Sequence, residues 1–106
     1  MSPQFVKSKR LRSKKHMAHV RSFGCCICQN PVCDAHHLRS MGHLASAALK
    51  NGDDYTVPLC RMHHDELHAF GDEALFFALH GVDVGLILDT VRETSDVVQG
   101  KSKGED

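Results

Sequence analysis

The sequence lacks long apolar runs. No stretch approaches the roughly 20 consecutive apolar residues that a helix needs to cross a bilayer, and the N-terminus lacks the apolar stretch of a signal peptide. These absences leave no predicted membrane span and no predicted secretory leader, so we expect a soluble protein in the cytoplasm. Internal repeats are absent as well, and 106 residues suffice for one domain with a modest core.

Acidic residues are absent from the chain before Asp34. Because the formal net charge of the whole chain is zero, this absence concentrates positive charge at the N-terminal end. A cationic arm suits the neutralisation of phosphates, although a solubilising tail would carry the same charge. The cations that precede Asp34 are Lys7, Lys9, Arg10, Arg12, Lys14, Lys15 and Arg21.

The chain has five cysteines, and a reducing cytoplasm would keep them from forming disulfides. Clustered cysteines in such a compartment are more often metal ligands. Small domains also often gain stability from a bound metal. An odd count leaves at least one cysteine outside any paired scheme. The five are Cys25, Cys26, Cys28, Cys33 and Cys60.

Turn signals and periodicity predict an α+β fold. The turn at Asn30-Pro31 is expected to separate two short extended segments within residues 25–38, which would form a hairpin with a cysteine knuckle. A further extended segment is expected over residues 55–59. Residues 39–54 between them are expected to form a loop.

Four helices are predicted where apolar residues recur at helical spacing and a glycine or a capping aspartate marks an end. Pro58 delays the second helix, because the residue before a proline disfavours helical geometry. The last helix is expected to place Val84, Ile87, Leu88 and Val91 on one face. The expected helices span residues 15–23, 61–70, 73–81 and 83–95.

The stretch VPLCRMHHDELHAF, residues 57–70, holds four candidate metal ligands. Successive helix residues point about 100° apart, so His64 and His68 lie on the same face and can share one ion. His63 points in a different direction and follows Cys60 by three residues, a spacing found in paired zinc ligands. The helix therefore divides its ligands between two ions.

A structural zinc is predicted from two ligand pairs. The spacings C-x2-C and C-x2-H together supply the closed tetrahedral ligand set of such a site. Buried reduced cysteines in a core are the alternative interpretation. Cys26 and Cys33 also compete as ligands. The predicted zinc ligands are Cys25, Cys28, Cys60 and His63.

A second ion is predicted at His64 and His68, with the adjacent pair His36-His37 as the source of a third ligand. On an extended strand neighbouring rings point to opposite sides, so one ring can bind the ion while the other handles a proton. Three histidines with open coordination positions are typical of a catalytic metal, because water or substrate must reach it. The remaining histidines are interpreted as surface or core residues: His16, His19, His43 and His80.

The segments CCIC, DAHHL and VPLCRMHHDELH together resemble the HNH endonucleases, whose ββα-metal motif is a hairpin followed by a helix. The resemblance is closest to the small zinc-containing branch often found in phages and prophages, and it covers roughly residues 20–81. It implies a metal-dependent endonuclease that hydrolyses DNA phosphodiester bonds. We accordingly expect a basic flexible arm over residues 1–14, one nuclease domain over residues 15–95 and a polar tail over residues 96–106.

The resemblance also implies a role for each candidate ligand. The zinc that braces the hairpin in this family corresponds to the four predicted zinc ligands. The family pattern makes His36 a ligand of the catalytic ion and His37 the general base, with His64 and His68 as the ligands carried by the helix. The catalytic ion is expected to be a divalent metal such as Mg2+, Mn2+, Ni2+ or Zn2+.

The middle asparagine of the family, which supports the ring of the base, has no clear counterpart here. Asp54 or Tyr55 lies near its place. Arg39, beside the histidine pair, and Lys14 and Lys15 are the expected substrate-binding residues, since phosphates attract such cations. DNA is the expected partner and no membrane is involved, while a homodimer or a phage or host partner in recombination or packaging stays open.

Two functions of other classes also stay open. The first is a non-catalytic, zinc-stabilised nucleic-acid-binding module, in which the paired histidines would be surface residues. The second is a regulator that binds metal reversibly through its histidines. The two cysteine-containing pairs argue against a regulator, because they indicate a permanently bound zinc.

Overall fold

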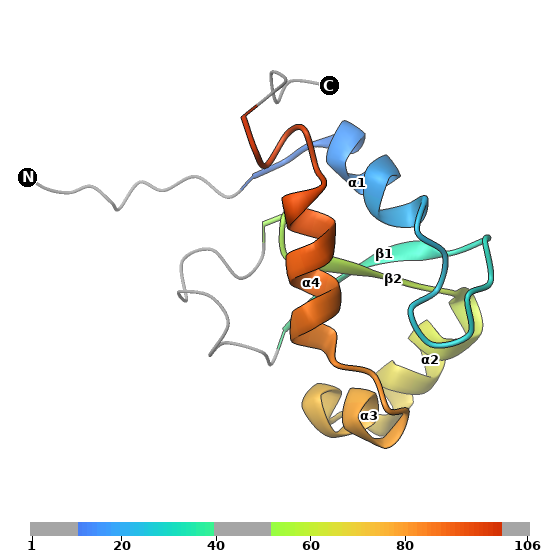
Figure 1. Ribbon diagram of the computed structural model, residues 1–106. Coiled ribbons are helices and arrows are strands. Elements are labelled where there is room, and N and C mark those ends of the chain that lie inside the picture. Colours follow the sequence, from blue (N-terminus) through green and yellow to red (C-terminus); the bar gives the residue numbers. More distant parts are fainter. Residues whose placement is uncertain (1–10, 40–51, 101–106) are drawn as a thin grey trace, which may run out of the picture.

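A two-stranded antiparallel sheet forms the centre of the fold (Figure 1). The computed structural model describes residues 11–39 and 52–100. Strand β1 spans Asp34–His37 and pairs with β2, which spans Thr56–Leu59. The expected α+β class is confirmed. The helices α1 to α4 span, in chain order, Lys14–Arg21, Arg61–Phe70, Glu73–Leu79 and Val84–Glu93.

The helices pack around the sheet (Figure 1): α1 contacts both strands, α4 contacts β2, and α2 contacts both β2 and α3. All four residues of β2 are buried as a result. The apolar face of α4 packs as predicted, with Val84, Leu88 and Val91 buried and Ile87 partly buried. The sheet is thus held from several directions, which fixes the side chains that β1 presents.

Local signals in the sequence mark the helix ends. Ser13, Asp72 and Asp83 each accept a hydrogen bond from the backbone N–H three residues later, at 3.0 to 3.1 Å. Gly71 ends α2 with a φ of 91°, a conformation that a Cβ disfavours. The bounds of α2 are as predicted, and the other three helices differ from prediction by one or two residues at an end.

The hairpin expected within residues 25–38 is wrong, because its first half is a turn rather than a strand. Gln29 N donates to Cys25 O at 2.7 Å, and Ile27 N donates to Cys25 Sγ at 3.4 Å. The chain therefore wraps around this sulfur instead of extending. The pair of strands that the structure contains is β1 with β2.

Several expectations concern residues outside the described ranges. Residues 1–10, 40–51 and 101–106 include most of the arm, most of the predicted loop, His43 and the end of the tail. The predicted domain boundaries stay predictions. Among the described residues no single helix is long and apolar enough to cross a membrane; α3 and α4 together meet the length and composition, with a bend of 97° between them.

Candidate functional site

Three cysteines and one histidine gather where the turn before β1 meets the start of α2. Cys25 and Cys28 come from the turn. Cys60 directly precedes α2, and His63 lies in the first turn of that helix. Their ligand atoms all lie within 4.8 Å of one another. The two predicted ligand pairs therefore meet in one cluster.

The spacing of these atoms fits a tetrahedral zinc. Cys28 Sγ lies 3.8 Å from Cys60 Sγ, and two sulfurs that are each about 2.3 Å from a tetrahedral zinc lie about 3.8 Å apart. His63 Nδ1 lies 3.2 Å from Cys60 Sγ and 3.8 Å from Cys25 Sγ. Three of the four residues are buried, which suits a structural ion closed to solvent.

The backbone around the cluster favours the thiolate of Cys25. Burial alone would raise the pKa of this thiol, but hydrogen bonds from the backbone N–H groups of Cys28, Cys60 and Ile27 outweigh burial and lower the pKa to about 6. Zinc binds the thiolate and not the thiol. The turn that replaces the expected strand therefore favours the thiolate form of Cys25, which is the form that binds a metal.

The two competing cysteines lie outside the cluster. Burial raises the pKa of Cys26 to about 12, so its sulfur stays protonated. Its backbone N–H donates to Pro58 O at 2.9 Å, which ties the turn to β2. Cys33 is also buried, burial raises the pKa of its thiol, and its Sγ donates to Arg21 O at 3.4 Å. Neither cysteine joins the four ligands.

Three histidines form a second cluster between β1 and α2. The ligand atoms of His36, His64 and His68 all lie within 4.8 Å of one another. His64 Nε2 and His68 Nε2 are 3.2 Å apart, and two nitrogens bound to one tetrahedral ion at about 2.0–2.1 Å lie about 3.3–3.4 Å apart. The ring of His36 completes the cluster, with its centroid 5.0 Å from that of His64. These residues fit one divalent ion.

Electrostatics and access both suit a metal at this cluster. Burial lowers the pKa of His64, and the neighbouring rings of His36 and His68 lower it further, so the neutral form that binds metals is favoured. A hollow of about 260 Å³ opens beside the cluster. Its lining residues are His36, Arg39, Leu67, His68, Gly71 and Glu73.

The two histidines of β1 face opposite sides, as strand geometry predicts. His36 is 3% exposed and turns toward the three-histidine cluster, whereas the side chain of His37 is 37% exposed. His37 Nε2 lies 2.9 Å from Asp53 Oδ1. Asp53 is buried, and its Oδ2 accepts a hydrogen bond from Ser13 N at 2.8 Å. Asp53 thus ties His37 to the start of α1.

The side chain that contacts the His37 ring is Asp53, which directly precedes Asp54 and Tyr55, the two residues that the sequence placed near the position of the family's asparagine. Asp54 Oδ2 accepts from Arg92 Nη1 at 2.7 Å, and the Arg92 guanidinium lies 4.6 Å from the ring centroid of Tyr55. In the described part of the chain neither residue hydrogen-bonds to the His37 ring, and the side chain that contacts this ring is Asp53. The adjacent aspartates Asp53 and Asp54 in GDDYTVPLC indicate that a carboxylate could lie near His37, but only the fold decides which of the two faces β1.

Glu73, in the first turn of α3, is a second residue that the sequence did not indicate. Its Oε1 lies 2.9 Å from His36 Nε2, and its Oε2 accepts from Arg39 N at 2.9 Å. The carboxylate is buried, with 4% of the residue exposed. Because 37 residues separate Glu73 from His36, the sequence does not indicate their contact. An acid at this position is typical of the first turn of a helix.

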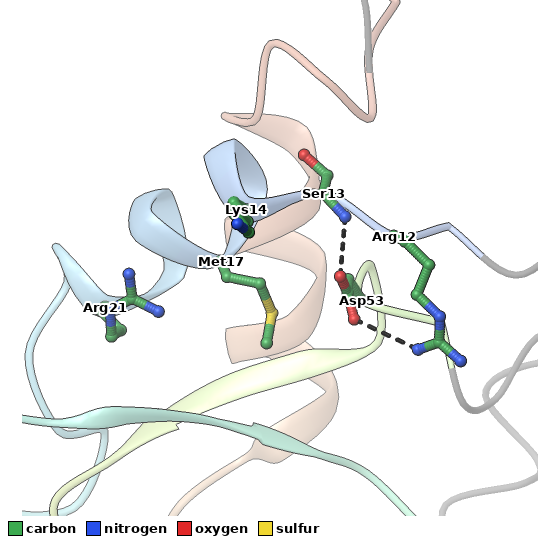
Figure 2. Close-up of a pocket in the computed structure, with 6 residues that line it drawn as sticks. All are labelled: Arg12, Ser13, Lys14, Met17, Arg21 and Asp53. Atoms are coloured by element: carbon green, nitrogen blue, oxygen red, sulfur yellow. Dashed lines mark hydrogen bonds and ion pairs between the residues drawn. The ribbon is translucent and has the colours of Figure 1, made fainter. Parts of the chain in front are cut away.

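A basic groove of about 520 Å³ lies beside α1, and Figure 2 shows Asp53 between Met17 and Arg12 in its lining. The predicted substrate-binding residues are spread over three places. Lys14 lines this groove, Lys15 lines a smaller hollow near the end of α4, and Arg39 lines the hollow beside the three histidines. The residues lining the groove are Arg12, Ser13, Lys14, Met17, Arg21 and Asp53 (Figure 2).

The other described histidines are held by neighbouring residues. His16 is fully buried, its Nδ1 lies 2.7 Å from Ser95 Oγ, and burial lowers its pKa. His19 Nε2 lies 2.9 Å from Thr94 Oγ1. These two contacts join α1 to the end of α4. The ring of His80 packs near that of His63, with centroids 5.5 Å apart.

Residues 4–97 match the family model described as "Protein of unknown function (DUF968)". The chain is also 35% identical over 81 residues to "Uncharacterized protein YdfU" of Escherichia coli (strain K12). That alignment covers 76% of this chain and 22% of YdfU, so the chain spans about a fifth of the length of this relative. No solved structure matches the chain. Because the family model covers most of its length, the chain belongs to the DUF968 family.

Proposed function

We propose that this protein is a metal-dependent endonuclease of the HNH type that hydrolyses DNA phosphodiester bonds. The observation that carries the proposal is the division of the adjacent pair His36-His37. His36 is one of three histidines suited to a divalent ion, and His37, the next residue of β1, contacts the carboxylate of Asp53. Hydrolysis of a phosphodiester needs charge stabilisation at the phosphate and a base for the attacking water.

His37 is the proposed general base, and Asp53 orients it. The carboxylate accepts a hydrogen bond from Nε2–H of His37, which leaves Nδ1 as the ring nitrogen that can take a proton. A water molecule gives its proton to Nδ1 as its oxygen attacks phosphorus. The bond from phosphorus to the 3′ oxygen then breaks, and the leaving oxygen takes a proton from solvent.

His36, His64 and His68 are the proposed ligands of the catalytic ion, for which Mg2+, Mn2+, Ni2+ and Zn2+ are candidates. When bound, such an ion supplies positive charge to the phosphate and to the leaving oxygen. The three side chains converge because β1 carries one of them and one turn of α2 separates the other two. The hollow beside them gives a phosphate room to approach.

The four zinc ligands have a structural part in this scheme. His63 faces the cysteine cluster and His64 faces the histidine cluster, although the two are neighbours on α2. A zinc held by His63 would fix the rotation of α2, and the same rotation aims His64 at the proposed catalytic ion. We propose that the cysteine cluster thereby positions the histidine cluster.

The basic groove supports DNA as the substrate. Arg12, Lys14 and Arg21 supply three cations around it. The one acid in its lining, Asp53, pairs with Arg12 at 3.6 Å and accepts hydrogen bonds from Ser13 N and from His37. A DNA backbone that lies in the groove would reach the carboxylate that holds the base (Figure 2). Contacts of this kind position the backbone without reading bases.

We further propose a cytoplasmic location, in keeping with five cysteines that are all free.

The number of strands that are cut bears on the oligomeric state. One active site cuts one strand, so a double-strand cut needs either a homodimer or a second cleavage event. A phage or host partner in recombination or packaging would bring the DNA to this site.

A plasmid assay tests the proposed function. Purified protein that carries its zinc would be incubated with supercoiled plasmid, with and without added Mg2+, Mn2+, Ni2+ or Zn2+. We expect nicked or linear products that require the added ion. Binding of plasmid without cleavage under every ion would instead indicate a non-catalytic nucleic-acid-binding module.

A further inference from the structure

Glu73 is a buried carboxylate at the edge of the three-histidine cluster. An ionised carboxylate is costly to bury unless its oxygens accept hydrogen bonds. Both oxygens of Glu73 have such contacts: Oε2 accepts from the backbone N–H of Arg39, and Oε1 lies 2.9 Å from His36 Nε2. The first turn of α3 is thereby tied to the end of β1, where the proposed ligand His36 lies.

The contact with Glu73 decides which nitrogen of His36 can bind a metal. A carboxylate oxygen accepts hydrogen bonds, so the ring nitrogen that faces it, Nε2, carries the proton. In a neutral imidazole the other nitrogen, Nδ1, then has a free lone pair. His36 is 3% exposed, so water does not compete for its ring. The ring is held in one tautomer and one orientation.

We propose that Glu73 is a positioning residue that holds His36 in the Nε2–H tautomer and so presents Nδ1 as a ligand to the ion. Carboxylates behind metal-binding histidines commonly have this effect, and their loss typically costs about 10–100-fold in metal affinity. Because the ion belongs to the proposed nuclease site, the inference rests on the proposed function. It adds a residue from α3, an element other than β1 and α2, which carry the three ligands.

Glu73→Gln is the informative substitution. Its carbonyl oxygen can still accept from Arg39 N, but its amide group then donates toward His36 Nε2. The ring must accept at Nε2 and carry its proton on Nδ1, where it blocks metal binding. Glu66→Gln makes the same chemical change at an exposed position of α2 and is the matched control.

Isothermal titration of the full, zinc-loaded chain with Ni2+ measures the effect without any cleavage reaction. We expect the affinity of Glu73→Gln for Ni2+ to fall by about 10–100-fold, while Glu66→Gln keeps the wild-type affinity and all three proteins keep their zinc. A folded Glu73→Gln chain with unchanged Ni2+ affinity would overturn the inference and leave the proposed nuclease standing. A wild-type chain that binds no ion besides its zinc would overturn both.

The tautomer of His36 can be measured in the wild type alone, so the inference stays testable if the variant does not fold. Long-range proton–nitrogen NMR at about pH 8, above the ordinary histidine pKa of about 6.5, identifies the protonated ring nitrogen. We expect Nε2–H for His36 in the zinc-loaded chain without further metal. A proton on Nδ1 would overturn the inference.

Discussion

His37 Nε2 lies 2.9 Å from Asp53 Oδ1, and the other oxygen of the same carboxylate accepts from Ser13 N at 2.8 Å. One buried side chain thus joins β1 to the residue that caps α1. The proposed base depends for its orientation on this link, and the carboxylate that makes the link also lines the basic groove.

Asp53→Asn should lower the rate of DNA cleavage by about 10²–10⁴-fold, the range that a general base contributes. If the amide oxygen keeps the bond to Ser13 N, the NH2 group donates to His37 Nε2 and moves the ring proton to Nδ1. That nitrogen can then no longer accept a proton from water. Cleavage kinetics at saturating metal, with DNA affinity measured separately, test this effect.

Asp54→Asn is the control for Asp53→Asn, because it makes the same change one position later. Asp54 pairs with Arg92 and not with His37. We expect a lower melting temperature, since this pair is partly buried, and a cleavage rate close to that of the wild type. Equal losses of activity in the two variants would contradict the role given to Asp53.

Cys28→Ala should release the zinc and unfold the domain. Structural zinc in small peptides binds with about 10–16 kcal/mol at pH 7, and this free energy stabilises the folded state. Cys26→Ala removes a neighbouring thiol that lies outside the ligand cluster and should keep one zinc per chain. Metal analysis and circular dichroism distinguish the two. Zinc retained by a folded Cys28→Ala protein would refute the ligand set.

The stability of the fold should decrease at mildly acidic pH because of His16. Burial lowers the pKa of His16 in the folded protein, and His19 lowers it further, while Asp54 and Asp53 act in the opposite direction. The unfolded chain therefore binds this proton more readily. The contribution of His16 is complete above its unfolded pKa of about 6.5 and is lost as the pH falls toward the lower folded pKa.

His16→Asn tests this pH dependence, because asparagine does not titrate and can still hydrogen-bond to Ser95. Free energies of unfolding from urea titrations of zinc-saturated protein should fall less steeply below about pH 6.5 in the variant than in the wild type. The same slope in both proteins would show that His16 does not carry the effect.

Lys14→Gln should weaken DNA binding to all sequences alike. Lys14 lines the basic groove, and removing one phosphate contact should reduce the slope of log affinity against log salt concentration by about 1. Lys15→Gln changes the next residue, which lines a different hollow, and should leave the slope nearly unchanged. A larger effect at Lys15 would place the DNA on another face of α1.

The ligand clusters were predictable because their spacing is local. A helix over residues 61–70 sends His63 one way and His64 and His68 another, whatever the rest of the chain does. Alternation on a strand likewise separates His36 from His37. These rules act over a few residues, so the sequence suffices to apply them.

The supporting carboxylates and the turn could not be derived in the same way. Asp53 and Glu73 reach the histidines of β1 across 16 and 37 residues, so only the packing of α1 and α3 brings them there. Residues 25–29 have the β-branched and cysteine content of a strand, yet hydrogen bonds to Cys25 Sγ and Cys25 O turn the chain. In residues 25–29 the tertiary contacts and the arrangement of the four zinc ligands therefore outweigh the local preference for a strand.

The most direct test of the proposed nuclease is the His37→Ala variant in the plasmid assay. Zinc content, Ni2+ affinity and DNA affinity would be measured on the same preparation to show that fold and binding are intact. We predict that cleavage falls by about 10²–10⁴-fold and partly recovers when imidazole is added. Cleavage at the wild-type rate by folded, metal-loaded His37→Ala protein would contradict the assignment of the base.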